Sequence, residues 1–292
     1  MQSENCNNLA KTPEDSKQVA ATSQLEPKEE NLMQQGNKIF EYIDNYRKNI
    51  RNLRVCPDVV PGFMSQQIPE DPPVKAETLD DIMRDVTDKI LPGLVHWTSP
   101  YMHAYFPAQT STPSILAEAL SAAINSICFT WASSPSGTEL EMIVMDWLAR
   151  MIDLPDKFIH ANTSTSGGGT ILTTCSEATL NSMMAARKRA IDQLRVMNMD
   201  ECYHESDTVI NAKLVAYVSE MAHSSLKKNA QICMFRLQAL PVDETTGGLR
   251  GATLLRQMYK DISLGLVPFY VCATLGTTGC CTFDHLDEIC DT

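Results

Sequence analysis

The chain has 292 residues and a formal net charge of −12, with 43% hydrophobic and 21% charged residues. This composition is that of a globular protein and excludes wholly disordered, collagen-like and coiled-coil chains. The acidic balance, without a basic cluster, argues against nucleic acid and anionic membranes as partners. The longest apolar stretch, 264–275, is shorter than the roughly 20 residues that a membrane-spanning helix needs.

The cysteines favour a reducing compartment. Ten cysteines are scattered along the chain, several of them among apolar residues, as at Cys233 and Cys272. Residues 1–8 lack the basic-then-apolar order of a signal peptide. We therefore expect reduced thiols and a cytoplasmic protein. Cys202 and His204 are two positions apart, but no further ligands at metal spacing accompany them, so no metal site is expected.

The first part of the chain divides into two regions. Residues 1–35 contain no aromatic residue and are rich in Asn, Gln, Glu, Ser and Lys, which predicts a disordered polar tail. Residues 36–111 carry apolar stripes at helical spacing over 39–50 and 79–90, with a proline-marked segment between them. These two helices need a surface to cover them, either elsewhere in the chain or on a partner subunit.

From residue 112 onward, helical stretches alternate with short β-like runs. The predicted helices are 114–126, 138–152, 177–195 and 252–263, and the predicted strands are 214–218, 232–235 and 267–273. Continuous apolar strands alternating with amphipathic helices are typical of an α/β domain whose parallel sheet is covered on both faces.

A Gly-rich turn is the first segment that could carry chemistry. Residues 166–170 lead into a predicted helix with Ser176 as its N-cap and Glu177 in its first turn. Free amides at a helix start, with a serine hydroxyl, form a site for a phosphate group. The glycines fit neither the P-loop nor the dinucleotide fingerprint. A flexible loop before a capped helix explains the same residues.

Two further segments follow predicted strands, at the strand ends where open α/β sheets bind ligands. His223 follows the first strand, and its imidazole can stack on a flat ring or move a proton, although most single histidines do neither. Thr277 and Thr278 follow the last strand and offer hydroxyls between two glycines, a composition that an ordinary turn shares. Asp284 comes next and can orient a neighbouring group.

Aromatic residues are dense at 99–107 and 129–131. Core packing is the usual explanation for such a cluster, and a pocket for a flat substrate is the alternative.

Together these motifs resemble the pyridoxal-phosphate-dependent aromatic amino acid decarboxylases of animals, which include the aromatic-L-amino-acid, tyrosine and histidine decarboxylases. The matching segments lie between about 36 and 285 and read HWTSPYMHAYFPA, FTWASSPSGTELE, GGGTILTTCSEATL, LVAYVSEMAHSS and VPFYVCATLGTTGCCTFD. The resemblance implies a PLP-dependent transferase-like (fold type I) large domain, incomplete, over 112–292. It also implies that 36–111 is a helical dimerisation segment.

The resemblance assigns roles around the cofactor, pyridoxal 5′-phosphate (PLP). Cys175 and Ser176 correspond to the pair that holds its phosphate, and His223 to the histidine stacked on its ring. Thr278 corresponds to a threonine beside the cofactor, and Asp284 to an aspartate that supports the histidine region.

The resemblance also implies a substrate pocket. Tyr105, Phe106 and Ala108 correspond to residues that line it. Ile127 and Phe129 correspond to residues that the other subunit of a homodimer contributes.

The implied reaction is the loss of CO₂ from an aromatic L-amino acid (tyrosine, DOPA, 5-hydroxytryptophan or histidine) to give its amine. The family's Schiff-base lysine follows the segment that matches Asp284, and none of the lysines in this chain matches it. We therefore expect a C-terminally truncated decarboxylase that is inactive alone. One alternative is a non-catalytic isoform that pairs with a full-length subunit and modulates it. Another is a module that binds a phosphate ligand without chemistry.

Overall fold

The computed structural model describes residues 31–106, 108–161, 164, 167–197 and 206–292. Most of the predicted tail, residues 1–30, lies outside the described residues. The chain divides into two compact units, Met1–Ser111 and Thr112–Thr292.

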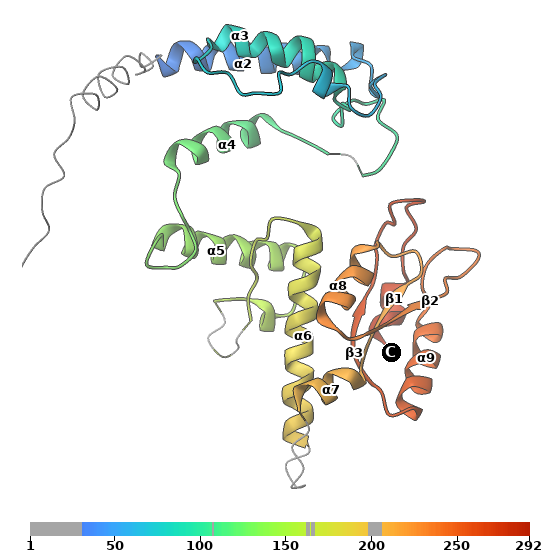
Figure 1. The fold of residues 1–292 in the computed structure, drawn as a ribbon. Coiled ribbons are helices and arrows are strands. Elements are labelled where there is room, and N and C mark those ends of the chain that lie inside the picture. Colours follow the sequence, from blue (N-terminus) through green and yellow to red (C-terminus); the bar gives the residue numbers. More distant parts are fainter. Residues whose placement is uncertain (1–30, 107, 162–163, 165–166, 198–205) are drawn as a thin grey trace, which may run out of the picture. The chain divides into compact units, whose positions relative to one another are not determined.

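The first unit begins with helix α2 (Leu32–Asn49) (Figure 1). The side chain of Asn31 caps it, since Asn31 Oδ1 accepts hydrogen bonds from Met33 N at 3.0 Å and Gln34 N at 3.4 Å. Residues 32–35 are therefore helical, whereas their polar composition assigned them to the tail. The cap explains the difference, because it satisfies amides that are otherwise free at a helix start.

The second predicted helix of this unit is composite. It consists of α3 (Leu79–Asp85), a π-helical turn at Val86–Ile90 and a 3₁₀ turn at Leu91–Gly93. Pro92 has no amide to donate within a helix, which explains why the helix ends there. Shorter 3₁₀ turns lie at Ile50–Asn52 and Met64–Gln66.

Polar contacts join the helices of the first unit. Lys38 Nζ lies 2.7 Å from Asp80 Oδ1, which links α2 to α3. Farther along α2, Tyr46 Oη lies 2.8 Å from Nδ1 of the buried His96. Burial lowers the pKa of His96 and raises that of Tyr46, so both groups are held neutral near pH 7.

The second unit is an α/β unit. Its helices are α4 (Thr112–Ile124), α5 (Pro135–Met151), α6 (Cys175–Met197), α7 (Asp207–Lys213), α8 (Ser225–Cys233), α9 (Gly251–Ser263) and α10 (Leu286–Cys290), with a 3₁₀ turn at Asp156–Phe158. Its strands are β1 (Leu214–Ser219), β2 (Arg236–Leu240) and β3 (Val267–Cys272). They form a parallel sheet in the order β2-β1-β3, so the predicted α/β class with a parallel sheet is confirmed.

The core lies on both faces of the central strand β1, and every residue of β1 is buried. Leu214, Ala216 and Val218 pack with α6, α7 and α8, whereas Val215 and Tyr217 pack with residues of α9 and the segment before it. This alternation follows from the two-residue period of a strand. Figure 1 shows α6 and α8 on one side of the sheet and α9 on the other.

The strand predicted at 232–235 is wrong. Ile232 and Cys233 form the last turn of α8, Met234 takes a left-handed conformation with φ 58°, and β2 begins at Arg236. A short apolar run has no period of its own, so the end of a helix and the approach to a strand can both produce it.

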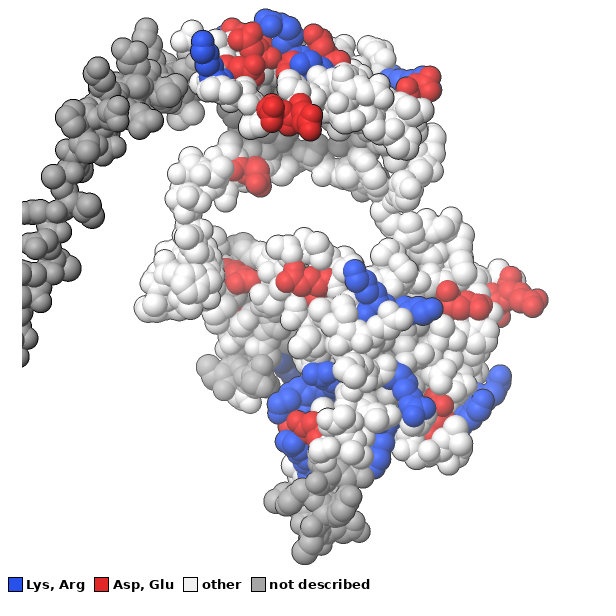
Figure 2. All heavy atoms as spheres, in the orientation of Figure 1, with Lys and Arg blue, Asp and Glu red and all other residues white. Residues whose placement is uncertain are grey.

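Acidic and basic side chains are interspersed on the face shown in Figure 2. Within the described ranges, no helix combines the length and the apolar character needed to cross a membrane.

Candidate functional site

The first turn of α6 carries Cys175 and Ser176. Thr174, rather than the predicted Ser176, caps the helix, because Thr174 Oγ1 accepts a hydrogen bond from Glu177 N at 3.1 Å. The Glu177 carboxylate turns back and accepts hydrogen bonds from Thr173 N and Thr173 Oγ1. The prediction missed that 174–177 read Thr-Cys-Ser-Glu, the sequence pattern of a capping box.

This turn has the features that a phosphate group requires. The amides of Cys175 and Ser176 have no hydrogen-bond acceptor among the described residues, and both side chains are exposed. Free N–H groups at a helix start carry partial positive charge and point outward, and the Ser176 hydroxyl adds a further donor. The residues present at the start of α6 therefore fit the phosphate of the implied cofactor.

The glycines before α6 serve close packing. A Cβ atom at Gly167 would lie 1.9 Å from Lys157 O, and one at Gly168 would lie 2.3 Å from His160 Nε2. Glu141 on α5 fixes the following residues, since it accepts hydrogen bonds from Ile171 N at 2.7 Å and Thr170 Oγ1 at 2.9 Å. The segment is therefore anchored on its neighbours over 167–171.

A buried carboxylate holds the segment that packs under these glycines. Asp146 on α5 accepts hydrogen bonds from His160 N at 2.7 Å and Ala161 N at 3.0 Å, and it lies 3.0 Å from His160 Nδ1. Burial raises the pKa of Asp146, but the hydrogen bonds from His160 and Ala161 outweigh it and hold that pKa below its usual value.

His223 lies just beyond the carboxyl end of β1, and its ring is exposed. Ser225 holds the ring from the start of α8, with its N–H donating to Nδ1 at 3.2 Å and its Oγ at 2.8 Å from the same atom. Because a backbone N–H can only donate, Nδ1 is an acceptor and the neutral ring carries its proton on Nε2. The ring is thus oriented, with Nε2–H available to a ligand.

The segment after β3 is held by Asp284. Its carboxylate is buried and accepts hydrogen bonds from Leu249 N at 2.8 Å and Thr274 N at 2.7 Å. Asp284 N donates to Thr274 O at 2.9 Å. No bond between Asp284 and His223 occurs in the part of the chain that the structure describes. Asp284 therefore fixes the backbone at Thr274 and Leu249.

The two threonines of this segment have different environments. Thr277 is buried, its Oγ1 accepts a hydrogen bond from Thr282 N at 3.1 Å, and it lies 3.0 Å from Thr282 Oγ1. Thr278 is exposed. Thr277 therefore stabilises the turn, whereas the Thr278 side chain is exposed. A hydrogen bond with Thr277 also lowers the pKa of the exposed Cys280 thiol.

The predicted pocket residues belong to both units. Tyr105, Phe106 and Ala108 lie in the first unit, and all three are exposed. Tyr105 has a left-handed φ of 61° and stacks on Trp97 with ring centroids 5.3 Å apart. Ile127 and Phe129 lie in the second unit, with exposed fractions of 66% and 78%.

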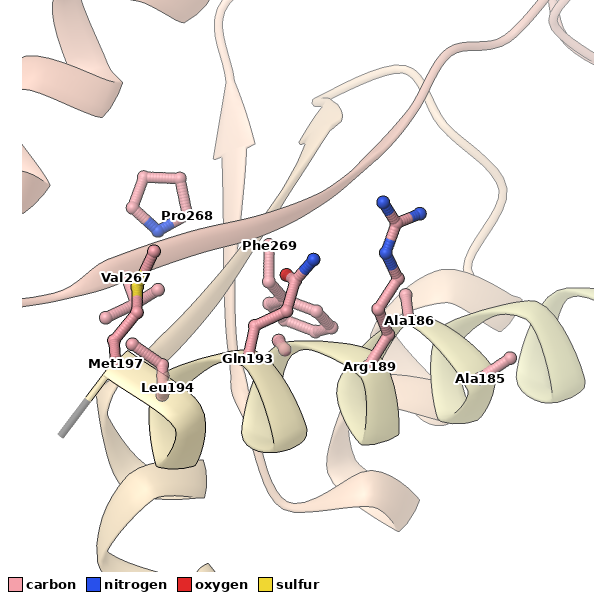
Figure 3. Close-up of a pocket in the computed structure, with 10 residues that line it drawn as sticks. Ala185, Ala186, Arg189, Gln193, Leu194, Met197, Val267, Pro268 and Phe269 are labelled. Atoms are coloured by element: carbon pink, nitrogen blue, oxygen red, sulfur yellow. The ribbon is translucent and has the colours of Figure 1, made fainter. Parts of the chain in front are cut away.

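A groove of about 650 Å³ lies between α6 and β3, and none of the predicted site residues lines it (Figure 3). Its walls are Ala185, Ala186, Arg189, Ala190, Gln193, Leu194 and Met197 of α6 with Val267, Pro268 and Phe269 of β3. The groove lies at the amino end of β3, whereas His223 and Thr278 follow the carboxyl ends of their strands. It is therefore separate from the candidate site.

The sequence interpretation did not single out Asn229. This residue lies inside α8, is 3% exposed, and its Nδ2 donates to Ser176 O at 2.9 Å. The sequence did contain a signal for it, namely an asparagine on the apolar side of a helix. A buried amide requires a hydrogen-bond partner.

Residues 61–292 match the family model described as the pyridoxal-dependent decarboxylase conserved domain. The chain belongs to this family. This match confirms the predicted family and its pyridoxal-based cofactor, and the solved structures described below confirm the fold-type-I architecture.

Curated relatives include histidine decarboxylase of Drosophila melanogaster, which is 49% identical over 261 residues, covering 88% of this chain and 30% of the relative. Histidine decarboxylase of Homo sapiens is 46% identical over 91% of this chain and 39% of the relative. Aromatic-L-amino-acid decarboxylase of Cavia porcellus is 42% identical over 87% of this chain and 52% of the relative. The chain thus spans about half or less of the length of these relatives.

Solved structures share the fold. Tryptophan decarboxylase of Catharanthus roseus, in complex with L-tryptophan, matches with a TM-score of 0.80 and 36% identity, over 91% of this chain and 55% of that one. A structure from Oryza sativa described as TDC with PLP and tryptamine matches with a TM-score of 0.80 and 33% identity, over 91% of this chain and 53% of that one.

Proposed function

We propose that the protein to which these residues belong decarboxylates an aromatic L-amino acid or histidine, with PLP as its cofactor. The free amides at the start of α6 carry this proposal, because they fit the cofactor phosphate in a chain that is 42–49% identical to histidine and aromatic-L-amino-acid decarboxylases. Histidine is the first substrate to test, since the histidine decarboxylases compared above are 46–49% identical and the aromatic-L-amino-acid decarboxylase is 42% identical.

The cofactor, when bound, supplies an electron sink for the electron pair left on the substrate as CO₂ departs. The residues of this chain bind and orient it. The amides of Cys175 and Ser176 would bind the phosphate, and the exposed ring of His223 would stack on the pyridine ring. Ser225 keeps the proton of the neutral His223 ring on Nε2, and the exposed Thr278 hydroxyl would donate to the cofactor.

We further propose that residues 1–292 alone bind PLP without releasing CO₂. The resemblance locates the Schiff-base lysine after the segment that matches Asp284. The lysines that follow His223, Lys227 and Lys228, are exposed on α8. Release of CO₂ from any of the four amino acids by the purified 292-residue chain would contradict this part of the proposal.

Apolar exposure supports pairing with a second subunit. No described residue of α4 is buried, and Leu120 and Ile124 are 61% and 65% exposed. Phe129 and Trp147 are also exposed on the same unit. Many exposed apolar side chains on one unit are a feature of interaction surfaces, and dimers are the commonest soluble homo-oligomers. The proposed partner is a second copy, or a full-length subunit that this chain modulates.

A cytoplasmic location is part of the proposal. All cysteines in the described residues are free thiols, as expected in a reducing compartment. Fractionation of cells that express the protein, followed by detection in the soluble fraction, tests it, and recovery from the secretory pathway would contradict it.

The reaction is tested on the full-length protein with histidine, tyrosine, DOPA and 5-hydroxytryptophan, by measuring the CO₂ and amine released. Ser176→Ala should raise the PLP concentration needed for half-saturation, and His223→Ala should abolish turnover while the protein stays folded. Ser182→Ala is the matched control on α6, since Ser182 Oγ contacts Tyr270 Oη at 2.7 Å, away from the first turn. A wild-type protein that releases no CO₂ from any of the four would contradict the proposal.

A further inference from the structure

Helix α8 connects two parts of the candidate site. At its start, Ser225 holds the His223 ring through Nδ1. One turn later, Asn229 Nδ2 donates to Ser176 O in the first turn of α6 at 2.9 Å. Figure 1 shows α8 beside α6, and the two helices are in contact. One short helix therefore carries both Ser225, which holds the His223 ring, and Asn229, which holds the first turn of α6.

The Asn229 side chain is an unexpected choice for packing alone. It is 3% exposed, and its neighbours on the buried side of α8 are Leu226, Ala230 and Cys233. Asparagine is less favourable inside a helix than leucine or alanine, and a buried amide is costly unless it is hydrogen-bonded. An apolar side chain would fill this place at lower cost. What the amide adds is a directional bond.

That bond fixes the backbone of α6. Because Asn229 binds the carbonyl of Ser176, it restrains the first turn itself, and the amides of Cys175 and Ser176 move with that turn. A second contact joins the same two helices, from Arg187 Nη1 to Cys233 O at 3.0 Å. Arg187 lies 11 positions after Ser176, about 16 Å along α6. Its bond therefore joins α6 to the C-terminal end of α8, far from the first turn of α6.

We propose that Asn229 is a positioning residue that sets the spacing between the His223 ring and the phosphate-binding amides of α6. The proposal rests on the proposed function, because it takes the ring and the phosphate of PLP as the two parts that must be bound at once. Two linked groups bind far more tightly than the separate groups only when both subsites are correctly spaced. Asn229 therefore acts on the linked ligand and leaves each separate subsite unchanged.

The test uses 4′-deoxypyridoxine 5′-phosphate, which has no aldehyde and so cannot react with lysines. Its affinity for the 292-residue chain is compared with those of deoxypyridoxine and inorganic phosphate, by titration calorimetry. Asn229→Leu keeps the number and branching of the side-chain heavy atoms and removes the donor. It should weaken binding of the phosphorylated ligand about fivefold, which corresponds to the loss of one hydrogen bond. The two partial ligands should bind as they do to the wild type.

Arg187→Met is the matched control, because it removes the other bond between the helices. It should lower stability but leave all three affinities unchanged. Unchanged affinity of Asn229→Leu for the phosphorylated ligand would overturn the inference and leave the proposed function standing. Equal losses for all three ligands would also overturn it, since they would mark a general effect on folding. If the wild type binds none of the three, the proposal that residues 1–292 bind PLP fails, and this inference fails with it. Should Asn229→Leu not fold, Asn229→Ser takes its place.

Discussion

Tyr217 Oη donates a hydrogen bond to Asp261 Oδ2 at 2.9 Å, and both side chains are buried between β1 and α9. Gln257 Nε2 donates to the other carboxylate oxygen, Asp261 Oδ1, at 3.0 Å. Burial and the neighbouring Asp261 carboxylate raise the pKa of Tyr217. This is a polar contact in the apolar layer that α9 forms on the sheet, and it fixes how α9 lies on β1.

Tyr217→Phe should destabilise the protein by about 1–3 kcal/mol, because it leaves a buried carboxylate oxygen without its donor. Urea unfolding followed by circular dichroism measures the difference. Tyr259→Phe, on the exposed face of α9, is the control and should change stability by less than about 0.5 kcal/mol. Equal stability of Tyr217→Phe and the wild type would show that the bond contributes nothing net.

The hydrogen bonds of Glu141 with Ile171 and Thr170 predict that the stability of the protein depends on pH in the acidic range. Hydrogen bonds from Ile171 N and Thr170 Oγ1 lower the pKa of Glu141. A carboxyl whose pKa is depressed on folding stabilises the protein above its unfolded pKa, about 4.3, and this contribution is lost as the pH falls through the folded value. Glu141→Gln should therefore be less stable than wild type at pH 7 and approach it near pH 3.

Denaturant midpoints measured from pH 7 to pH 3 test this. Glu118 is exposed on α4, so the denaturant midpoint of Glu118→Gln should differ from that of the wild type by the same amount at every pH. If the deficit of Glu141→Gln were the same at every pH, the ionised carboxylate would not be its source.

Gly168→Ala should destabilise the second unit. Its φ of 152° is a conformation that other residues rarely adopt, and the new Cβ would lie 2.3 Å from His160 Nε2.

Gly36→Ala should change stability in the opposite direction, because nothing lies within 4 Å of the added Cβ inside α2. It should stabilise α2 by about 0.5–1 kcal/mol. Thermal unfolding of Gly168→Ala and Gly36→Ala measures both changes in stability. A Gly168→Ala variant more stable than the wild type would contradict the close packing of residues 167–171.

Thr174 and Ser176 have different roles at the start of α6, and two alanine variants separate them. Thr174→Ala removes the cap on Glu177 N and should cost about 1 kcal/mol of stability. Ser176→Ala should leave stability within about 0.5 kcal/mol of wild type and weaken binding of 4′-deoxypyridoxine 5′-phosphate. A loss of stability in Ser176→Ala and none in Thr174→Ala would instead identify Ser176 as the N-cap.

Much of the fold could be predicted where the pattern is local and periodic. The continuous apolar run at 214–218 predicts the buried strand β1, and the helical spacing over 252–263 predicts α9. The strand prediction at 232–235 was wrong because four apolar residues are too few to show a period. The left-handed Met234 separates the end of α8 from the residues that lead into β2. The cap of α6 could have been found at Thr174, from its spacing to Glu177.

The amino-acid order alone establishes the family, the α/β class and the residue types at the candidate site, because motifs and periodicity are properties of neighbouring positions. The contacts of those residues depend on packing. Asp284 binds Leu249, 35 positions away, and Asn229 binds Ser176, 53 positions away. No local pattern encodes such pairs. They form only because the parallel sheet brings the carboxyl ends of its strands, and the helices that follow them, to one edge, where each buried polar group must find a partner.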